Sequence, residues 1–307
     1  MTKSSGGASG QKRPPRQAVH GWVILDKPEG VPSTKAVNIV RRVFNAAKAG
    51  HSGTLDPLAS GILPIALGEA TKTIPHVMDA SKDYAFTIAW GAETETDDRE
   101  GAVTVTADTR PDSAAIEAIL PRFTGRISQT PPLYSAIKLD GRRAYDRARN
   151  NEVVDMPARE VDIHRLELIS NSATEARFSA TTGKGAYIRS LGRDLARELG
   201  SAAHIIHLRR ERVGPFRLDM SISLDFFENI DNSADAFEAL HPVMTALADI
   251  PAVAITEDDA ERLRCGQKIA APAGGDVAVA LHQGAPVAIV HIDKGEASPK
   301  RVFNLPT

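Results

Sequence analysis

The segment that decides the fold of this chain reads AGHSGTLDPLASG and runs from Ala49 to Gly61. Its glycines and its proline are too closely spaced for a helix or a strand, so the composition predicts a loop over the whole range. The glycines leave the main chain uncovered, which allows a bound molecule to contact the backbone directly. The same loop carries His51, Ser52 and Asp56, whose side chains can transfer protons or act as nucleophiles. The sequence therefore predicts a functional loop here.

Three interpretations of this loop are open from its residues alone. In the first, Asp56 caps a helix that has Pro57 in its first turn. In the second, His51 and Ser52 belong to a hydrolase triad, although Ser52 lacks a G-x-S-x-G elbow and adjacent side chains of an extended segment point apart. In the third, Asp56 is a lone carboxylate nucleophile or base, and it then needs a cation from elsewhere in the chain to keep it ionised.

Hydrophobic periodicity predicts regular structure on both sides of the loop. A helix is expected from Ser33 or Thr34, because apolar residues recur at the helical period as far as Ala47. Strands are predicted over Gly21–Leu25, Ile62–Leu67, Asp83–Gly91, Val103–Thr106, Leu133–Leu139, Val161–Ile169 and Ala176–Thr181, and helices over Glu69–Met78, Ser113–Phe123, Tyr187–Leu199 and Leu224–Glu228. Strands and helices mix without a regular βαβ alternation. This order is typical of an α+β fold with a mostly antiparallel mixed sheet and flanking helices.

The pattern changes near residue 250. A short helix over Glu257–Arg264 stands among alternating segments such as Val277–Leu281 and Pro286–Ile292, which indicates a small β-barrel-like domain. We therefore expect three parts: a disordered basic tail over 1–19, a main domain over 20–249 and a small C-terminal domain over 250–307.

The charge is balanced overall but uneven along the chain. The 307 residues carry 37 Lys and Arg against 39 Asp and Glu, which excludes a uniformly basic protein. Cations nevertheless concentrate over Arg122–Arg149 and Lys184–Arg217, whereas Leu218–Ala260 is acidic and has no Lys or Arg. Such segments can be solvated helix faces, but two of them together with a basic tail favour a protein that holds a polyanion.

The residue types and their spacing disfavour a disulfide, a membrane span, a metal site and a calcium loop. The single Cys265 cannot form an internal disulfide, and no apolar run is long enough to cross a membrane, so we expect a cytoplasmic protein. His204 and His207 have no third ligand at a useful spacing, so no metal is expected. The acidic run Glu93–Glu100 does not fit a calcium loop and is expected to be solvated.

The loop Ala49–Gly61 closely resembles the catalytic loop of the TruB family of tRNA pseudouridine synthases, whose pattern is G-H-x-G-x-L-D-P-x-A-x-G. Every fixed position is met. Leu25–Pro28, Lys82–Tyr84 and Gly185–Leu191 also match family motifs in the same order, so the resemblance spans about Gly21 to Val213. The visible departure is Ala186, where the family commonly has Thr.

The resemblance implies a fold and an activity. It implies the pseudouridine synthase fold with a PUA-like C-terminal domain, which here rests on position in the chain alone. The implied reaction converts a uridine of tRNA to pseudouridine, at position 55 in the T-loop, after the base is flipped out. The reaction needs no cofactor. By the same resemblance Asp56 is the catalytic carboxylate, which attacks the sugar or removes a ribose proton, and Arg189 is its ion-pair partner.

The resemblance also implies roles for five further residues. Tyr84 and Tyr187 offer flat rings for the flipped base, although on periodicity alone each is a half-buried core residue. His51 would enter the space that the base leaves, and the backbone of Leu208 would line the uracil pocket. Lys27 belongs to a Lys-Pro turn behind the pocket, where a structural role is the better interpretation.

Rival functions stay open at this point. One is an RNA-binding module or RNA chaperone with a vestigial pocket, another is a Ser/His hydrolase, and a third is a related synthase acting on ribosomal or other RNA. The partner that we expect is the T-arm of tRNA, bound by a monomer through the basic stretch Arg142–Arg149 and its neighbours.

Overall fold

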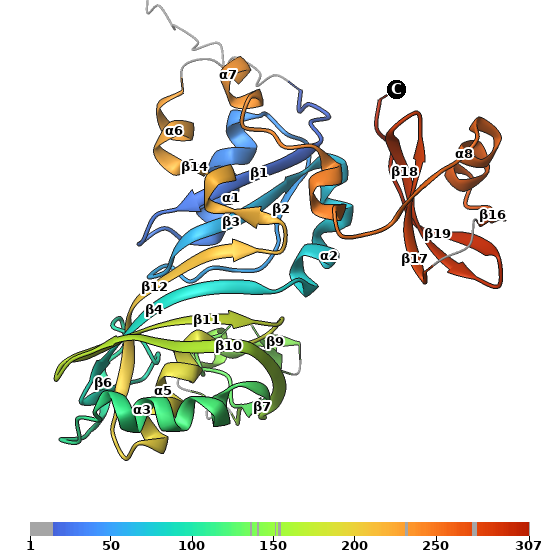
Figure 1. Ribbon diagram of the computed structural model, residues 1–307. Helices are drawn as coiled ribbons and strands as arrows, with labels where there is room; N and C mark the ends of the chain where they lie inside the picture. The colour runs from blue at the N-terminus through green and yellow to red at the C-terminus, as the bar shows by residue number, and fades with distance from the viewer. Residues whose placement is uncertain are drawn as a thin grey trace, which may run out of the picture.

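The computed structural model describes residues 15–306, except 136, 140, 151, 153–154, 231–232 and 272–274. Its centre is a ten-stranded sheet in the order β14-β1-β3-β12-β4-β11-β10-β7, with β13 and β2 paired to β12 and β3 (Figure 1). The strands are β1 (Gly21–Lys27), β2 (Ala49–His51), β3 (Ser60–Leu67), β4 (Lys82–Trp90), β7 (Gly125–Gln129), β10 (Arg159–Asn171), β11 (Glu175–Thr182), β12 (Ala203–Val213), β13 (Phe216–Arg217) and β14 (Ile222–Ser223). Only the β12–β3 and β1–β14 pairs of this sheet are parallel among the described strands, which confirms the α+β prediction.

Helices flank this sheet and short hairpins extend it. The helical elements are α1 (Ser33–Val43), η1 (Gly68–Thr73), α2 (Ile74–Asp79), α3 (Ser113–Ile119), η2 (Leu120–Phe123), α4 (Ala144–Arg149), α5 (Ile188–Glu198), η3 (Leu218–Met220), α6 (Leu224–Asn229), α7 (Ser233–Phe237) and η4 (Val243–Leu247). Two small hairpins are formed by β5 (Ala92–Thr94) with β6 (Val103–Thr106) and by β8 (Lys138–Leu139) with β9 (Arg142–Arg143). Two predicted helices are each divided between a 3-10 and an α segment, at Pro75 and Pro121, because proline cannot donate the hydrogen bond that a continuous helix needs.

Helix α5 is held tightly against the middle of the sheet. Gly192 allows this approach, since a Cβ there would lie 2.9 Å from Ile88 and 3.0 Å from Ile205. Leu191 and Leu195 are fully buried in the core between the helix and the sheet. The close packing fixes the first turn of α5, which carries Arg189.

Three parts of the structure differ from the sequence prediction. Strand β12 was not predicted, because its run of four charged residues, Arg209–Arg212, obscures the alternation of buried and exposed positions. Ala49–His51 pairs with β3 as β2, and β3 begins at Ser60, so the predicted loop begins three residues too early and ends two residues too late. The predicted strand Leu133–Leu139 is irregular over 133–135 and extended only at Lys138–Leu139; residue 136 lies outside the described part.

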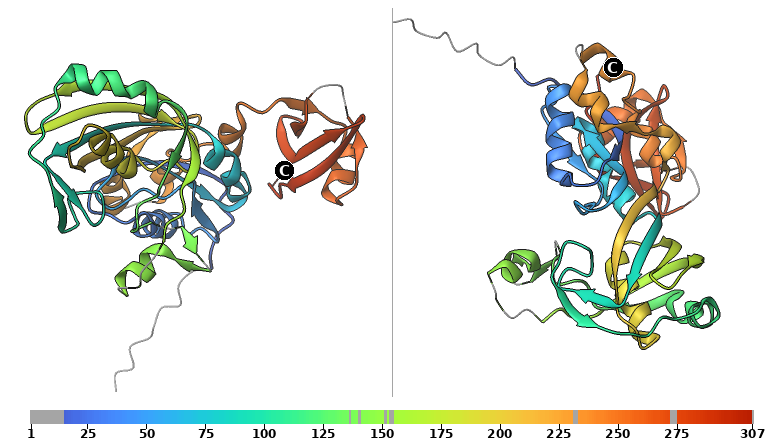
Figure 2. Two further views of the ribbon diagram at one scale, coloured as in Figure 1. Left: turned by 90° about the horizontal axis from the view of Figure 1, so that it is seen from below. Right: turned by 90° about the vertical axis from the view of Figure 1, so that its left-hand side faces the viewer.

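The C-terminal part forms a separate curled sheet of five strands, to one side of the main sheet (Figures 1 and 2). Its order is β15-β17-β18-β19-β16, and it consists of β15 (Ala252–Ala254), β16 (Ile269–Ala270), β17 (Val277–His282), β18 (Ala285–Asp293) and β19 (Glu296–Val302), with α8 (Glu257–Arg264) packed on it. The hydroxyl of Thr256 accepts a hydrogen bond from Asp259 N and caps α8.

This smaller sheet docks on the segment that follows β3. Val279 and Phe303 share an apolar cluster with Ala70 and Val77, and the ammonium of Lys72 donates to Val302 O at 2.7 Å. The smaller sheet therefore contacts η1 and α2 through apolar packing as well as a polar bond.

The expected disordered tail lies mostly outside the described residues. Over 15–19, however, the chain is fixed to the main body. Gln17 N donates to Asn45 O at 2.8 Å, Ala47 N donates to Gln17 O at 2.9 Å, and Val19 is buried. Residues 15–19 thus belong to the folded part of the protein.

Candidate active site

A cavity of about 980 Å³ lies where the segment Gly53–Leu58 meets β4, β12 and the start of α5. Asp56, Tyr84, Arg189 and Leu208 line it, and so does Tyr187, the residue before α5. The paired strands β4 and β12 place Tyr84 opposite Arg210, so these side chains share one face of the sheet. Segments that are far apart in the sequence are thereby brought to one cavity.

An ion pair joins two of these residues across the cavity wall. Arg189 Nε lies 2.9 Å from Asp56 Oδ2, and the arginine side chain is only 4% exposed, whereas the aspartate is 33% exposed. Arg189 Nε has no aligned hydrogen-bond acceptor, so the contact with Asp56 is electrostatic and not a directed hydrogen bond. The guanidinium of Arg189 thus faces the carboxylate of Asp56, which remains accessible from the cavity.

The guanidinium of Arg189 is fixed by two backbone carbonyls. Nη1 donates to Thr96 O at 2.7 Å and Nη2 donates to Tyr134 O at 3.0 Å. Because a guanidinium is planar and rigid, these two bonds determine where Nε points. The position of the ion pair therefore depends on the two segments that supply the carbonyls.

Three carboxylates of the acidic run Glu93–Glu100, those of Glu93, Asp97 and Asp98, are buried, so the prediction of a solvated loop is wrong for them, whereas Glu95 and Glu100 are exposed. Three arginines spaced four residues apart on α5 face it. Arg189 Nη1 lies 3.7 Å from Asp98 Oδ2, Arg193 Nη1 lies 2.7 Å from Asp97 Oδ2, and Arg197 Nη2 lies 2.5 Å from Glu93 Oε2. Burial raises the pKa of Asp97 to about 6, although the charges of Arg193 and Arg189 oppose this. These three ion pairs hold one face of α5 against the acidic run.

A buried amide fixes the residue that precedes α5. Gln129, at the end of β7, accepts from Tyr187 N at 2.8 Å and donates to Tyr187 O at 3.1 Å. The guanidinium of Arg159 lies 5.1 Å from the centre of the Tyr187 ring, a cation–π distance. Both contacts restrict the orientation of a ring that lines the cavity.

The segment that carries Asp56 is tied to α1 and to β12. The hydroxyl of Ser33 donates to Leu55 O at 2.7 Å and accepts from Leu55 N at 2.9 Å. Asp56 is followed by a turn and not by a helix, so the interpretation of Asp56 as a helix cap is wrong. The carboxylate is presented to the cavity from a fixed loop.

The sequence of this chain is similar to those of known proteins. The sequence matches the "TruB family pseudouridylate synthase (N terminal domain)" over residues 41–188 and the "tRNA pseudouridylate synthase B C-terminal domain" over residues 189–248. It is 53% identical to tRNA pseudouridine synthase B of Bradyrhizobium diazoefficiens, over 96% of this chain and 89% of that protein. The protein of the same name from Rhodospirillum rubrum is 49% identical over 94% and 98%. The chain belongs to the TruB family.

Solved structures agree with this assignment. The chain is similar to one in the crystal structure of a Cbf5-Nop10-Gar1 complex, with a TM-score of 0.70, 26% identity and coverage of 93% of this chain and 85% of that one. A chain of an H/ACA RNP bound to a substrate RNA containing 2'-deoxyuridine has a TM-score of 0.69 at 23% identity, over 93% and 85%, which shows a shared fold.

The two remaining residues that the TruB resemblance implicates, Lys27 and His51, do not line the cavity. Lys27 is fully buried, and its ammonium donates to Pro28 O at 2.8 Å and to Pro57 O at 3.3 Å. His51 lies in β2, where burial and the charge of Arg210 lower the pKa of its imidazole. Ser52 is fully buried and its hydroxyl has no hydrogen-bond partner. Ser52 therefore does not face the cavity as a nucleophile would.

The buried Lys27 makes the free energy of unfolding of this TruB-family protein depend on pH. Burial lowers the pKa of Lys27 to about 8 from 10.5, with the charge of Asp56 opposing and that of Arg210 adding to the shift. Between these values the unfolded chain keeps a proton that the folded lysine has lost, so Lys27 makes the free energy of unfolding rise with pH. Lys82, whose pKa burial also lowers to about 8, contributes in the same direction.

Urea unfolding of the wild type and of Lys27→Met from pH 8 to pH 10.5 measures this effect. We expect the variant to show a smaller rise, which is not abolished because Lys82 remains. Equal pH slopes in the two proteins would contradict the assignment of this effect to Lys27.

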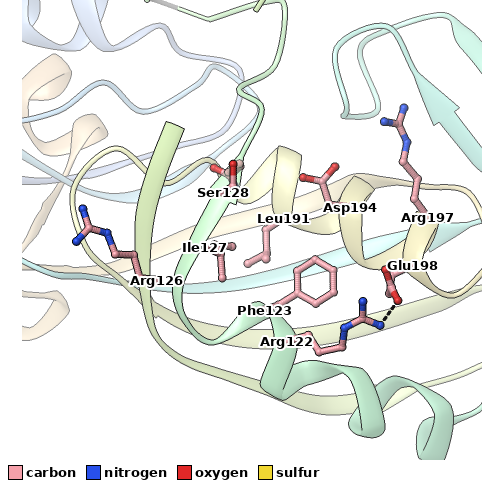
Figure 3. Close-up of a pocket in the computed structure, with 10 residues that line it drawn as sticks. Arg122, Phe123, Arg126, Ile127, Ser128, Leu191, Asp194, Arg197 and Glu198 are labelled. Carbon is pink, nitrogen blue, oxygen red and sulfur yellow. Dashed lines mark hydrogen bonds and ion pairs between the residues drawn. The ribbon is translucent and has the colours of Figure 1, made fainter. Parts of the chain in front are cut away.

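A second cleft, of about 510 Å³, lies between α5, η2 and β7 (Figure 3). Each of its three arginines has a carboxylate partner: Arg122 pairs with Glu198, Arg126 with Glu160 at 3.7 Å and Arg197 with Glu93. None of the residues to which the TruB resemblance gives a role lines this cleft, which favours the larger cavity as the TruB active site.

Several residues of the site were not predicted from the sequence. Asp98, Gln129 and Tyr134 reach it through backbone or long-range contacts, and Arg210 lies on the strand that was missed. Asp98 gave no signal of this kind, although Glu93 and Asp97 are four residues apart, as are the arginines of α5 that pair with them. Among the described residues no cluster of three or more His, Cys, Asp or Glu can hold a metal ion. None of the helices in the described part of the chain is long and apolar enough to span a membrane.

Proposed function

We propose that this protein converts uridine 55 in the T-loop of tRNA to pseudouridine. As a member of the TruB family, the chain is a tRNA pseudouridine synthase. The observation that carries the finer proposal is the Asp56–Arg189 ion pair, which joins two matched family motifs at the wall of one cavity.

The proposed reaction rearranges one nucleoside without adding or removing atoms. The bond between C1′ of the ribose and N1 of uracil breaks, the base turns over, and a bond forms between C1′ and C5. The hydrogen on C5 then leaves, and N1 takes up a proton. Asp56 starts this sequence as a nucleophile at the sugar or as a base on a ribose proton, and the charge of Arg189 stabilises its carboxylate. The isomerisation balances without a cofactor.

The surrounding rings replace the stacking that the uridine loses when it leaves the RNA. Tyr84 and Tyr187 line the cavity and offer flat surfaces, which are worth about 1–3 kcal/mol per base. The hydroxyl of Tyr84 is also placed to move a proton. The backbone of Leu208 contacts the uracil, and His51 stacks where the base has left; Lys27 supports the loop from behind.

The rest of the chain supports RNA binding in this proposal. The most exposed basic residues of Arg122–Arg149 and Lys184–Arg217, such as Arg142, Lys184 and Arg217, contact phosphates of the T-arm, which fixes the orientation of the tRNA without reading its sequence. Other arginines of the second range are instead held by partners within the fold, namely Arg189, Arg193, Arg209 and Arg210. Residues 20–249 form the catalytic domain and residues 250–307 form a PUA-like RNA-binding domain. The protein acts as a monomer in the cytoplasm.

Release of tritium tests the proposed reaction. A tRNA transcript labelled with tritium at C5 of its uridines should lose one equivalent to water when incubated with the protein, because the new bond forms at that carbon. A matched transcript with cytidine at position 55 should release none. Release from both transcripts would overturn the proposed position, and release from neither would overturn the proposed reaction.

The hydrolase alternative gives an opposite expectation for Ser52. We expect Ser52→Ala to form pseudouridine at a rate within about threefold of the wild type, because the hydroxyl is buried and bonds to nothing. Tritium release by both proteins measures this. Loss of activity in a folded Ser52→Ala protein would instead favour a hydroxyl nucleophile.

A further inference from the structure

Arg210 is a buried cation with no acidic partner. Its residue is 2% exposed, and no carboxylate of the described residues lies within ion-pair distance of its guanidinium. Burying a charge without a counterion is costly, so such a group persists only when its donors are satisfied in another way. In Arg210 they are satisfied by main-chain carbonyls.

These carbonyls belong to both ends of one segment. Arg210 Nη2 donates to Gly53 O at 3.2 Å and Nη1 donates to Thr54 O at 3.4 Å, whereas Nε donates to Ile62 O at 2.8 Å. The segment between these carbonyls carries Asp56. A single rigid guanidinium therefore links the point where the catalytic segment leaves the fold to the point where it returns.

The backbone of Arg210 adds a second constraint on the same segment. Arg210 pairs with Gly61 where β12 runs parallel to β3. A Cβ at Gly61 would lie 2.1 Å from Arg210 O, and Gly61 has a φ of +101°, so only glycine allows this contact. Both the side chain and the main chain of Arg210 thus fix the return of the segment.

Arg189 and Arg210 hold Asp56 by different means. Arg189 contacts the carboxylate itself, whereas Arg210 contacts the backbone on either side of it. Burial lowers the pKa of His51, and the charge of Arg210 contributes to the same shift. An imidazole titration can therefore report the charge at Arg210 separately from the geometry of the segment.

We propose that Arg210 is a positioning residue that holds the segment Gly53–Ile62, and with it Asp56, in the reactive geometry. This inference rests on the proposed function, since it assumes that Asp56 performs the chemistry. Arg210 acts through hydrogen bonds to the backbone, and its charge alone is not sufficient. Lysine keeps the charge but cannot reach three carbonyls with a planar fork.

The neighbouring Arg209 supplies a matched control. It lies on the same strand, and its Nη2 pairs with Asp26 Oδ2 at 2.7 Å, but it makes no side-chain bond to Gly53, Thr54 or Ile62. Arg209→Lys therefore tests the loss of an arginine from β12 without the loss of the three carbonyl contacts.

The experiment compares the wild type with Arg210→Lys, Arg210→Gln and Arg209→Lys. The measurements are the melting temperature, the Kd for a tRNA transcript, the single-turnover rate of tritium release with saturating enzyme, and the His51 pKa by NMR. We expect Arg210→Lys to stay folded, to bind tRNA within about threefold of the wild type and to react about 100-fold more slowly, the scale of a 1 Å misplacement. Arg209→Lys should react at the wild-type rate.

The two Arg210 variants separate geometry from charge. Both should be slow, whereas only Arg210→Gln should raise the pKa of His51. A normal rate in Arg210→Lys, or failure of that variant to fold, would overturn the positioning role, because the side chain would then act by charge or would hold the whole fold. If the wild type itself forms no pseudouridine, the proposed function fails, which is a different outcome from equal rates in an active wild type and Arg210→Lys.

Discussion

Asp56→Asn is expected to abolish pseudouridine formation while tRNA binding persists. The amide has the size of the carboxylate but carries no charge and is neither a useful nucleophile nor a base, so we expect the single-turnover rate to fall by at least about 10⁴-fold. The Kd for tRNA should stay within about threefold, because most of the binding free energy comes from contacts with phosphates. Tritium release and filter binding on the same transcript measure both quantities.

Asp26→Asn is the matched control for this variant. Asp26 is 32% exposed and pairs with an arginine, as the 33% exposed Asp56 does, but it lies outside the cavity. It should retain the wild-type rate. Product formation by Asp56→Asn would exclude Asp56 as the catalytic group, and an inactive wild type that binds tRNA would favour the RNA-binding alternative.

Arg189→Lys is expected to impair both the reaction and the fold. A lysine cannot meet Asp56, Thr96 O and Tyr134 O together, so buried acceptors and the carboxylate of Asp98 lose their partner. We expect the rate to fall by about 10²–10³-fold, as when one preorganised electrostatic contact is removed. The free energy of unfolding should fall by about 3 kcal/mol, the scale of a broken buried ion pair.

Single-turnover kinetics and urea unfolding of Arg189→Lys test these two expectations, with Arg209→Lys as the control. Arg209 pairs with Asp26 and its side chain is 37% exposed, so its replacement should cost less than about 1 kcal/mol. An Arg189→Lys protein as stable and as active as this control would show that the ion pair with Asp56 has no role in either property.

Much of the fold is predictable from the sequence because apolar periodicity marks elements that have one buried face. β1, β6 and α8 lie where the pattern places them, and β10 and β11 extend the predicted ranges by only one or two residues at each end. β1, α8, β10 and β11 bury apolar side chains against a core, so the local pattern and the tertiary structure agree. The four residues of β6 are all exposed, and this strand pairs only with β5 among the described strands.

β12 shows why the remainder is not predictable. Four consecutive charged residues in its second half suggest a solvated segment, yet Arg210 is buried because backbone carbonyls far away in sequence accept its hydrogen bonds. The acidic run Glu93–Glu100 misleads in the same way, since its partners lie on α5 about 100 residues later. A side chain whose partner is distant in the sequence leaves no local signal.

The residues of the site likewise fall into those that the sequence predicts and those that it does not. Asp56 and Arg189 are identified by motifs, and the structure brings them within 2.9 Å. Asp98 and Arg210, which hold them, and Gln129, which holds the backbone of Tyr187, act through the backbone or through the interior, and residue type alone does not predict those roles. Motifs thus predict the groups at the cavity, whereas only the structure reveals their supports.

Mass-spectrometric mapping of pseudouridine in an unmodified tRNA transcript tests the central claim most directly. The transcript is incubated with the purified protein and no additive, in parallel with Asp56→Asn. We predict one pseudouridine, at position 55, with the wild type and none with the variant. Pseudouridine at other positions only, its absence with the wild type, or its formation by Asp56→Asn would contradict the claim.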